Sequence, residues 1–218
     1  MATIYQLNSQ NPQVRSIDLI AKELKKGAIM LYPTDTVYAI GCDLNSKSAV
    51  ERVRQIKQLS GDKPLTFLCS SLSHISEYAI VNDQAYRIMK RLIPGPYTFL
   101  LPTTKLVPKL VMAPKRKTTG IRVPDNSICH GLLESLNNPI ISTSAHLSDE
   151  DGEFPSHEWE KFKLFDHLEK QVDIIIDDDT NPGLNVSTIL DFTGAEPTVV
   201  RKGLGWEKLE NWISFSNV

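Results

Sequence analysis

Leu31-Tyr-Pro-Thr-Asp-Thr-Val-Tyr-Ala-Ile-Gly-Cys-Asp43 is the stretch from which the organisation of this chain can be worked out. An apolar run ends at Pro33, which has no N–H to donate to a strand ladder, and a second run begins at Val37. Two buried strands are therefore predicted around a loop of two threonines and an aspartate. Such a loop can bind a small polar ligand. It can equally be a hairpin-like turn whose side chains satisfy nearby backbone groups.

The composition is typical of an ordinary soluble globular protein. The chain has 218 residues, of which 41% are hydrophobic and 23% charged, and this length suits one large domain. A net charge of -2 gives no global sign of nucleic-acid binding. The three cysteines form neither a zinc pattern nor an even disulfide set. Without a signal sequence or an apolar run of roughly 20 residues, we expect a cytoplasmic protein with no membrane partner.

Helical and strand patterns alternate along the chain. Helices are predicted at 16–26, 46–57, 72–78, 83–92 and 127–136, with another from about residue 156. Strands are predicted at 28–32, 37–40, 65–69, 97–101, 120–123, 140–142, 172–176, 186–191 and 198–201. Some consecutive strands have no helix between them, so an α/β fold with a mixed, twisted sheet flanked by helices is expected. Residues 1–218 are expected to form one domain, with a core at about 17–203.

Several familiar site motifs are absent. The sequence has no P-loop, no dinucleotide-binding glycine motif, no zinc-protease motif and no nucleophile elbow. Asp177-Asp-Asp179 has the carboxylates that magnesium prefers, but three acidic residues beside a turn are more often a solvated loop, so no metal site is predicted.

Hydroxyl and basic side chains recur just after apolar runs. In an open α/β sheet, ligands bind outside strand ends where loops converge. Taken singly, each basic residue reads as a surface charge and each hydroxyl as a cap or turn. Together they form a candidate polar site, made of Thr34, Thr36, Lys57, Lys63, Thr118, Arg122, Ser142, Ser144, Ser187 and Arg201.

A series of short segments in order resembles the YrdC-like family, and the details resemble its YciO branch. The resemblance covers about residues 17–203. The matching segments are Tyr32-Pro-Thr-Asp-Thr-Val-Tyr38, Gly41-Cys-Asp43, Ile56-Lys-Gln-Leu59, Lys63-Pro-Leu65, Pro94-Gly-Pro-Tyr-Thr98, Gly120-Ile-Arg-Val-Pro-Asp125, Ile141-Ser-Thr-Ser-Ala145, Ser187-Thr-Ile-Leu-Asp191, Arg201 and Gly203.

The resemblance implies a twisted sheet with a concave, positively charged face, and a reaction on it. L-threonine and bicarbonate would give N-carboxythreonine, which attacks the α-phosphate of ATP. The products would be threonylcarbamoyl-AMP and pyrophosphate, with magnesium accompanying the triphosphate, and the carbamoyl unit is destined for adenosine 37 of certain tRNAs. By position, the residues expected at threonine are Thr36, Arg122, Ser142 and Ser187, and those at ATP are Lys57, Lys63, Thr118, Ser144 and Arg201.

The chain departs from the family's catalytic Lys-x-Arg and Ser-x-Asn pattern. Here the first pair reads Lys57-Gln-Leu59 and the second Ser144-Ala-His146, so the catalytic set becomes Lys57, Ser144 and His146. Leu59 stands where an arginine would touch phosphate, and Leu68 stands where some relatives have a histidine near threonine. Because a lost donor to developing charge costs about 3 kcal/mol, weak or altered turnover is expected.

A second hypothesis is that the chain is a double-stranded RNA- or tRNA-binding module without turnover, since the family is often associated with such RNA. Residues 105–117 hold five basic residues and no acidic one, which favours phosphate contacts. The net charge and the acidic loops oppose it. RNA binding of this kind would fall steeply with salt.

Overall fold

Most of the strands and helices that the sequence predicts are present, and some consecutive strands have no helix between them. The strands are β1 (Thr3–Gln6), β2 (Ile29–Tyr32), β3 (Ala39–Asp43), β4 (Thr66–Leu68), β5 (Tyr97–Pro102), β6 (Thr118–Arg122), β7 (Ile140–Ser144), β8 (Ile174–Asp177), β9 (Thr188–Asp191) and β10 (Thr198–Arg201). The helices are α1 (Val14–Lys25), α2 (Lys47–Ile56), α3 (Leu72–Tyr78), α4 (Asp83–Leu92), α5 (Ser127–Leu136), α6 (His157–Leu168) and α7 (Trp206–Glu210). This computed structural model describes residues 1–59, 64–113, 117–145 and 157–210, and only the backbone of 157–160.

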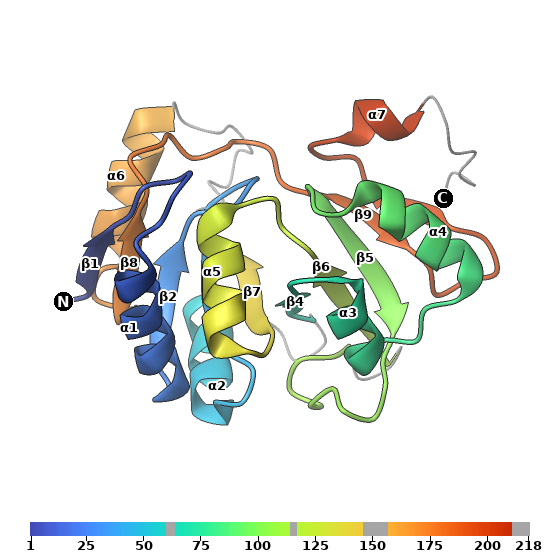
Figure 1. Cartoon of the computed structure of the whole chain (residues 1–218), viewed down its shortest axis with the longest axis horizontal. Coiled ribbons are helices and arrows are strands. Elements are labelled where there is room, and N and C mark those ends of the chain that lie inside the picture. Colours follow the sequence, from blue (N-terminus) through green and yellow to red (C-terminus); the bar gives the residue numbers. More distant parts are fainter. Residues whose placement is uncertain (60–63, 114–116, 146–156, 211–218) are drawn as a thin grey trace.

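One ten-stranded sheet runs through the described part of the chain, in the order β1-β8-β2-β3-β7-β4-β6-β5-β9-β10 (Figure 1). Strands joined by a short loop, such as β2 and β3, pair antiparallel, whereas β4 and β6 pair parallel across an intervening crossover. The predicted mixed α/β sheet is therefore confirmed.

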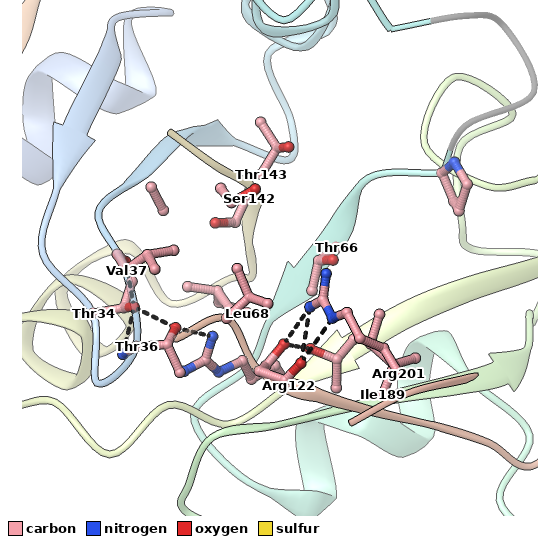
Figure 2. Close-up of a pocket in the computed structure, with 16 residues that line it drawn as sticks. Thr34, Thr36, Val37, Thr66, Leu68, Arg122, Ser142, Thr143, Ile189 and Arg201 are labelled. Carbon is pink, nitrogen blue, oxygen red and sulfur yellow. Dashed lines mark hydrogen bonds between the residues drawn. The ribbon is translucent and has the colours of Figure 1, made fainter. Parts of the chain in front are cut away.

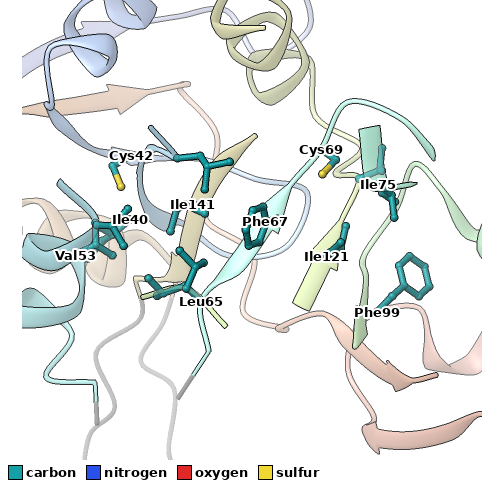
Figure 3. Close-up of a cluster of buried hydrophobic side chains, with 14 of the residues drawn as sticks. Ile40, Cys42, Val53, Leu65, Phe67, Cys69, Ile75, Phe99, Ile121 and Ile141 are labelled. Carbon is teal, nitrogen blue, oxygen red and sulfur yellow. The ribbon is translucent and has the colours of Figure 1, made fainter. Parts of the chain in front are cut away.

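One face of the sheet carries the larger core. Cross-strand neighbours such as Ile40, Ile141, Phe67, Ile121 and Phe99 are buried side by side there (Figure 3). Helices α2, α3, α4 and α6 contribute buried residues to the same cluster. In α2 these residues are Ala49, Val50 and Val53, at the helical spacing that predicted this helix.

The opposite face is divided into a covered and an uncovered part. Helices α1 and α5 lie side by side over it in Figure 1 and bury Met30, Tyr32, Ile140, Ile174 and Ile176 beneath them. Farther along the sheet the same face turns polar: the register aligns Gly41, Ser142, Thr66 and Gly120 in one row across β3, β7, β4 and β6. This polar strip is the floor of the candidate site.

Some boundaries differ from the sequence prediction. The strand expected from Val37 starts at Ala39, because the Val37 carbonyl accepts a hydrogen bond from Thr34 Oγ1 (2.7 Å) and so belongs to the loop. Strand β1 was not predicted, since its sequence is short and mostly exposed. The described residues of 105–117 form a loop.

Candidate functional site

A hollow opens on the uncovered polar strip. Together with its open mouth it spans about 680 Å³. Figure 2 shows that its wall combines hydroxyl, guanidinium and apolar groups. The lining residues are Thr34, Thr36, Val37, Ala39, Pro64, Thr66, Leu68, Thr98, Arg122, Ser142, Thr143, Ser144, Val186, Ser187, Ile189 and Arg201.

The loop 33–38 forms one wall of the hollow. Thr34 Oγ1 accepts from the backbone N–H of Thr36 (3.1 Å). Thr34 therefore satisfies a backbone group of its own turn, which is one of the two roles that the sequence left open for this loop. The Pro33 carbonyl accepts from the buried thiol of Cys129 in α5 (3.4 Å). On the other side, Gly183 lies so close that a Cβ there would be 1.8 Å from the Thr36 carbonyl oxygen. The loop is therefore clamped between two distant parts of the chain.

Arg122, the last residue of β6, reaches this loop. Its Nη1 donates to Thr36 Oγ1 (2.8 Å) and its Nη2 to Asp35 Oδ1 (2.5 Å). Only 9% of the Arg122 side chain and 11% of the Asp35 side chain are exposed, so the ion pair is desolvated. Arg122 Nε and Asp35 Oδ2 are buried and have no hydrogen-bond partner among the described residues. A buried charged pair normally has such atoms satisfied.

A second guanidinium lies on the far side of Arg122 from Thr36 (Figure 2). Arg201 donates through Nε and Nη2 to the Ser187 carbonyl (3.0 and 2.9 Å), and through Nη2 to Ser187 Oγ (3.2 Å). Ser187 Oγ also shares a 2.8 Å hydrogen bond with Thr98. Burial, with the positive charge of Arg122 as a smaller cause, lowers the pKa of Arg201. With Asp35 paired to Arg122, the two guanidiniums keep one net positive charge, which favours an anionic ligand.

Strand β7 supplies hydroxyls to the floor. Ser142 Oγ is 2.6 Å from the hydroxyl of Tyr32, which comes from β2 and reaches across Gly41 of β3. Burial raises the pKa of Tyr32, so this phenol stays neutral and can donate. Ser144 follows on the same face, at the end of β7. These hydroxyls offer neutral hydrogen bonds beside the two arginines.

The structure gathers most of the predicted site residues around this hollow. Those that line it are Thr34, Thr36, Arg122, Ser142, Ser144, Ser187 and Arg201. Lys57 and Thr118 lie outside the lining, and Lys63 and His146 fall outside the described residues. Sequence reasoning noted Asp35 but gave it no role. It also missed Thr66 and Thr98, which line the hollow, and Tyr32, which hydrogen-bonds Ser142, because nothing in their local sequence marks these contacts.

Thr118 and Ser144 lie toward one end of the strip. Thr66 pairs with both Ser142 and Gly120, so Ser144 and Thr118 are each two residues farther along in the same direction. Strand β4 also begins at this end of the strip. Two of the residues that the resemblance assigns to ATP, Thr118 and Ser144, therefore lie at this end of the strip.

The two altered family positions have different surroundings. Leu59 is half-buried and packs against the larger core cluster instead of lining the hollow. Leu68 is buried and lines the hollow, next to Arg122 in the β4–β6 ladder. Leu68 therefore gives the hollow an apolar side.

The acidic run after β8 is engaged by protein groups. Lys161 Nζ is 2.5 Å from Asp177 Oδ1, and Asp178 accepts from the Tyr38 hydroxyl (3.0 Å) and from Thr180 Oγ1 (2.8 Å). Across the described ranges, no three His, Cys, Asp or Glu side chains gather as metal ligands would.

The basic run lies apart from this hollow. Its described lysines Lys105, Lys109 and Lys117 are exposed and, with Met112, line a different depression of the surface. No described helix is long and apolar enough to cross a membrane.

The arrangement fits a small ligand that carries an anionic group and hydrogen-bonding groups. None of the three cysteines is placed to act as a nucleophile: all are buried, and burial raises the pKa of Cys42 and Cys69 to about 12. What the site can supply is positioning and electrostatic stabilisation.

Comparisons with known proteins agree with this picture. YciO of Escherichia coli K12, whose function is uncharacterized, is 42% identical over 205 residues, covering 94% of this chain and 97% of YciO. Its crystal structure matches with a TM-score of 0.85 at 40% identity over the same shares of the two chains. Threonylcarbamoyl-AMP synthase of Vibrio vulnificus YJ016 is 32% identical over 138 residues, which are 62% of this chain and 74% of that protein.

A crystal structure of P. abyssi Sua5 complexed with L-threonine matches with a TM-score of 0.86 at 25% identity, covering 100% of this chain and 63% of Sua5. The family model Sua5_yciO_yrdC, described as telomere recombination, matches residues 22–203. The sheet, the clamped loop and these matches together show that the chain belongs to the Sua5/YciO/YrdC family.

Proposed function

We propose that this protein is a nucleotidyltransferase of the L-threonylcarbamoyladenylate synthase type. It takes L-threonine, bicarbonate and ATP with Mg²⁺, and releases threonylcarbamoyl-AMP and pyrophosphate for modification of adenosine 37 in tRNA. The observation that carries the proposal is the desolvated Arg122, which borders a hollow lined by the hydroxyls of Thr36, Ser142 and Ser187. The synthase relatives and the threonine complex of Sua5 support it.

The proposed chemistry asks for positioning, not for a covalent intermediate on the protein. The threonine amine combines with bicarbonate and loses water, giving a carbamate. A carbamate oxygen attacks the α-phosphorus of ATP, and the bond to pyrophosphate breaks. Arg122 holds the threonine carboxylate, and Arg201 screens the charge that develops on phosphorus.

ATP is proposed to extend from the hollow toward Ser144 and Thr118. Gly120 favours this path, because a Cβ there would be only 3.2 Å from Thr66 Oγ1 and would narrow the strip. Mg²⁺ would arrive with the triphosphate, since magnesium commonly keeps its waters and binds through substrate phosphates. Contacts of Lys57 and Lys63 with the phosphates of ATP stay a prediction.

Turnover is expected to be slow. Leu59 cannot replace the guanidinium expected at its position, and it packs against the core. The double variant Leu59→Arg with His146→Asn should therefore raise turnover. No gain in a variant with an unchanged circular dichroism spectrum would show that the site has diverged elsewhere too.

Product analysis tests the proposal. The protein is incubated with ATP, Mg²⁺, L-threonine and bicarbonate, and threonylcarbamoyl-AMP is sought by mass spectrometry, with threonine omitted as the control. Threonine-dependent product is the expected result. A sample that binds both ATP and L-threonine but makes no product would contradict the synthase reading.

The exposed lysines Lys105, Lys109 and Lys117 favour a second candidate, binding of double-stranded RNA or tRNA. Binding should weaken steeply with salt, and replacing the three lysines by alanine should reduce that salt dependence. An unchanged slope in the triple variant would remove this surface from consideration.

A further inference from the structure

Lys161 of α6 points its ammonium group at the acidic turn that follows β8. The Lys161 nitrogen is 2.5 Å from Asp177 Oδ1 and 3.9 Å from Asp178 Oδ1. It also donates to the backbone carbonyl of Thr180 (2.9 Å). Only 16% of the Lys161 side chain and 3% of the Asp178 side chain are exposed. Because little water screens these groups, the two carboxylates would repel each other without the ammonium.

Other groups complete the surroundings of this ammonium. The Lys161 nitrogen lies 5.9 Å from the ring centroid of Tyr38 and 5.8 Å from that of Phe165. Asp178 accepts from the Tyr38 hydroxyl (3.0 Å) and from Thr180 Oγ1 (2.8 Å). Burial, with the charge of Asp178 as the second cause, raises the pKa of Tyr38, so the phenol keeps its proton and can donate. The turn is therefore built around one ammonium group.

The turn is joined at two points to the loop that forms one wall of the hollow. Tyr38 ends this loop, and its hydroxyl donates to Asp178. Gly183 follows in the same segment as Asp178 and lies so close to the Thr36 carbonyl that a Cβ would not fit between them. Since Arg122 donates to Thr36 Oγ1, a displaced turn would change the hollow itself.

We propose that Lys161 is a positioning residue for the hollow. Its ammonium neutralises the acidic turn, and the segment 177–183 then holds the loop 33–38 in its ligand-binding conformation. Lys161 does not line the hollow, so it acts only through this segment. The inference deepens the proposed function, and only its binding measurement rests on that function.

The test uses Lys161→Ala, which leaves a space that matches n-propylammonium. Hydrogen exchange of backbone amides should rise about 3- to 30-fold at 33–38 and at 177–183, and should stay unchanged in α2. The affinity for L-threonine, measured by calorimetry, should fall by a similar factor. Added n-propylammonium should partly reverse both changes, because it restores the charge. The uncharged n-propanol should reverse neither.

The control is Lys170→Ala, which removes an exposed lysine just after the same helix and should leave exchange and affinity unchanged. Three results with Lys161→Ala would overturn the proposal. Faster exchange at 177–183 alone would show that the turn does not hold the loop. An equal rise throughout the chain would show a general loss of stability. Equal rescue by n-propanol would show that Lys161 only fills space.

The exchange measurement separates this inference from the proposed function. Absence of L-threonine binding to the wild type would reject the proposed function, whereas exchange in the variants would still decide the role of Lys161. Should Lys161→Ala fail to fold, Lys161→Met keeps a long side chain without the charge. It should show the same faster exchange and no response to n-propylammonium, because its side chain occupies the space. Wild-type exchange at 33–38 in Lys161→Met would reject the positioning role.

Discussion

Arg122 combines charge with a planar shape, and the site uses both. Its two terminal nitrogens bind different residues, Thr36 and Asp35, in the fixed geometry of a planar fork, which a compact ammonium on a flexible stem does not reproduce. Arg122→Lys should therefore weaken L-threonine binding about 10- to 100-fold, measured by calorimetry. Arg87→Lys, an exposed change on α4, is the control. Wild-type affinity in Arg122→Lys would show that only the positive charge matters.

Gly183 is required by contact, not by an unusual backbone angle. A Cβ on Gly183 would be 1.8 Å from the Thr36 carbonyl, so Gly183→Ala must displace either the loop 33–38 or the segment that carries Gly183. We expect a loss of about 1–3 kcal/mol in the free energy of unfolding, as for overpacking, together with weaker ligand binding. Denaturant unfolding and calorimetry measure the two effects.

Gly194→Ala is the matched control for Gly183. A Cβ there would be 3.6 Å from its nearest neighbour, the Glu196 carbonyl oxygen, which is ordinary contact. Equal behaviour of the two alanine variants would mean that the loop tolerates displacement.

Among the helices, α5 connects the covered part of the sheet to the site. Asn126 caps its first turn by accepting from the Cys129 N–H (3.0 Å), and the Cys129 thiol donates to the Pro33 carbonyl. Asn126→Ala should lower the free energy of unfolding by about 1 kcal/mol. It should also weaken L-threonine binding, because the turn that holds Pro33 loosens.

Asn82→Ala separates these two effects. Asn82 caps α4 in the same way, by accepting from the Ala85 N–H (2.8 Å). The first turn of α4, however, lines neither the hollow nor the surface depression beside Pro94 and Tyr97. The stability loss should match that of Asn126→Ala while ligand affinity stays unchanged. If both variants bind L-threonine like the wild type, the cap of α5 does not support the site.

Elements with a strong periodic pattern could be predicted from the sequence, whereas β1 could not. The stripe of Ala49, Val50 and Val53 identified α2. Strand β1 is exposed at three of its four positions, so no alternation marks it, and only pairing with β8 makes it a strand.

In the site, too, residues marked by a local sequence pattern could be predicted, whereas contacts between distant residues could not. Thr36, Ser142, Ser187 and Arg122 were predicted because each lies within a predicted strand or in a loop beside one. The pairing of Arg122 with Asp35 joins residues 87 positions apart, and that of Tyr32 with Ser142 spans 110. The sequence holds 26 carboxylates and no local signal that selects Asp35 among them, so this contact required the fold.

In the molecule as a whole, the two faces of the sheet serve different purposes. One face buries the larger core, and the other is covered by α1 and α5 only in part, where the polar strip begins. The site therefore lies on a rigid sheet, with one wall made by a clamped loop. Binding geometry of this kind needs little reorganisation beyond that loop.

The thiols buried in the core make the stability of the protein depend on pH. Burial raises the pKa of Cys42 and Cys69 from 9.0 to about 12, and that of Cys129 as well. These thiols ionise at a higher pH in the folded protein than in the unfolded chain. Their contribution to stability is therefore complete below the pKa of the unfolded chain, near 9, and is lost as the pH rises toward 12. The free energy of unfolding should therefore fall above about pH 9, by about 1 kcal/mol per pH unit for each thiol.

Guanidinium unfolding at about pH 8 and about pH 10.5 measures this fall. Cys42→Ala should show a shallower alkaline slope than the wild type, because one buried thiol no longer has to stay neutral. The buried tyrosines Tyr32 and Tyr38, whose pKa values are raised chiefly by burial, act in the same direction above about pH 10, so some slope should remain. Equal stability at the two pH values would show that the thiols ionise in the folded protein as they do in the unfolded chain.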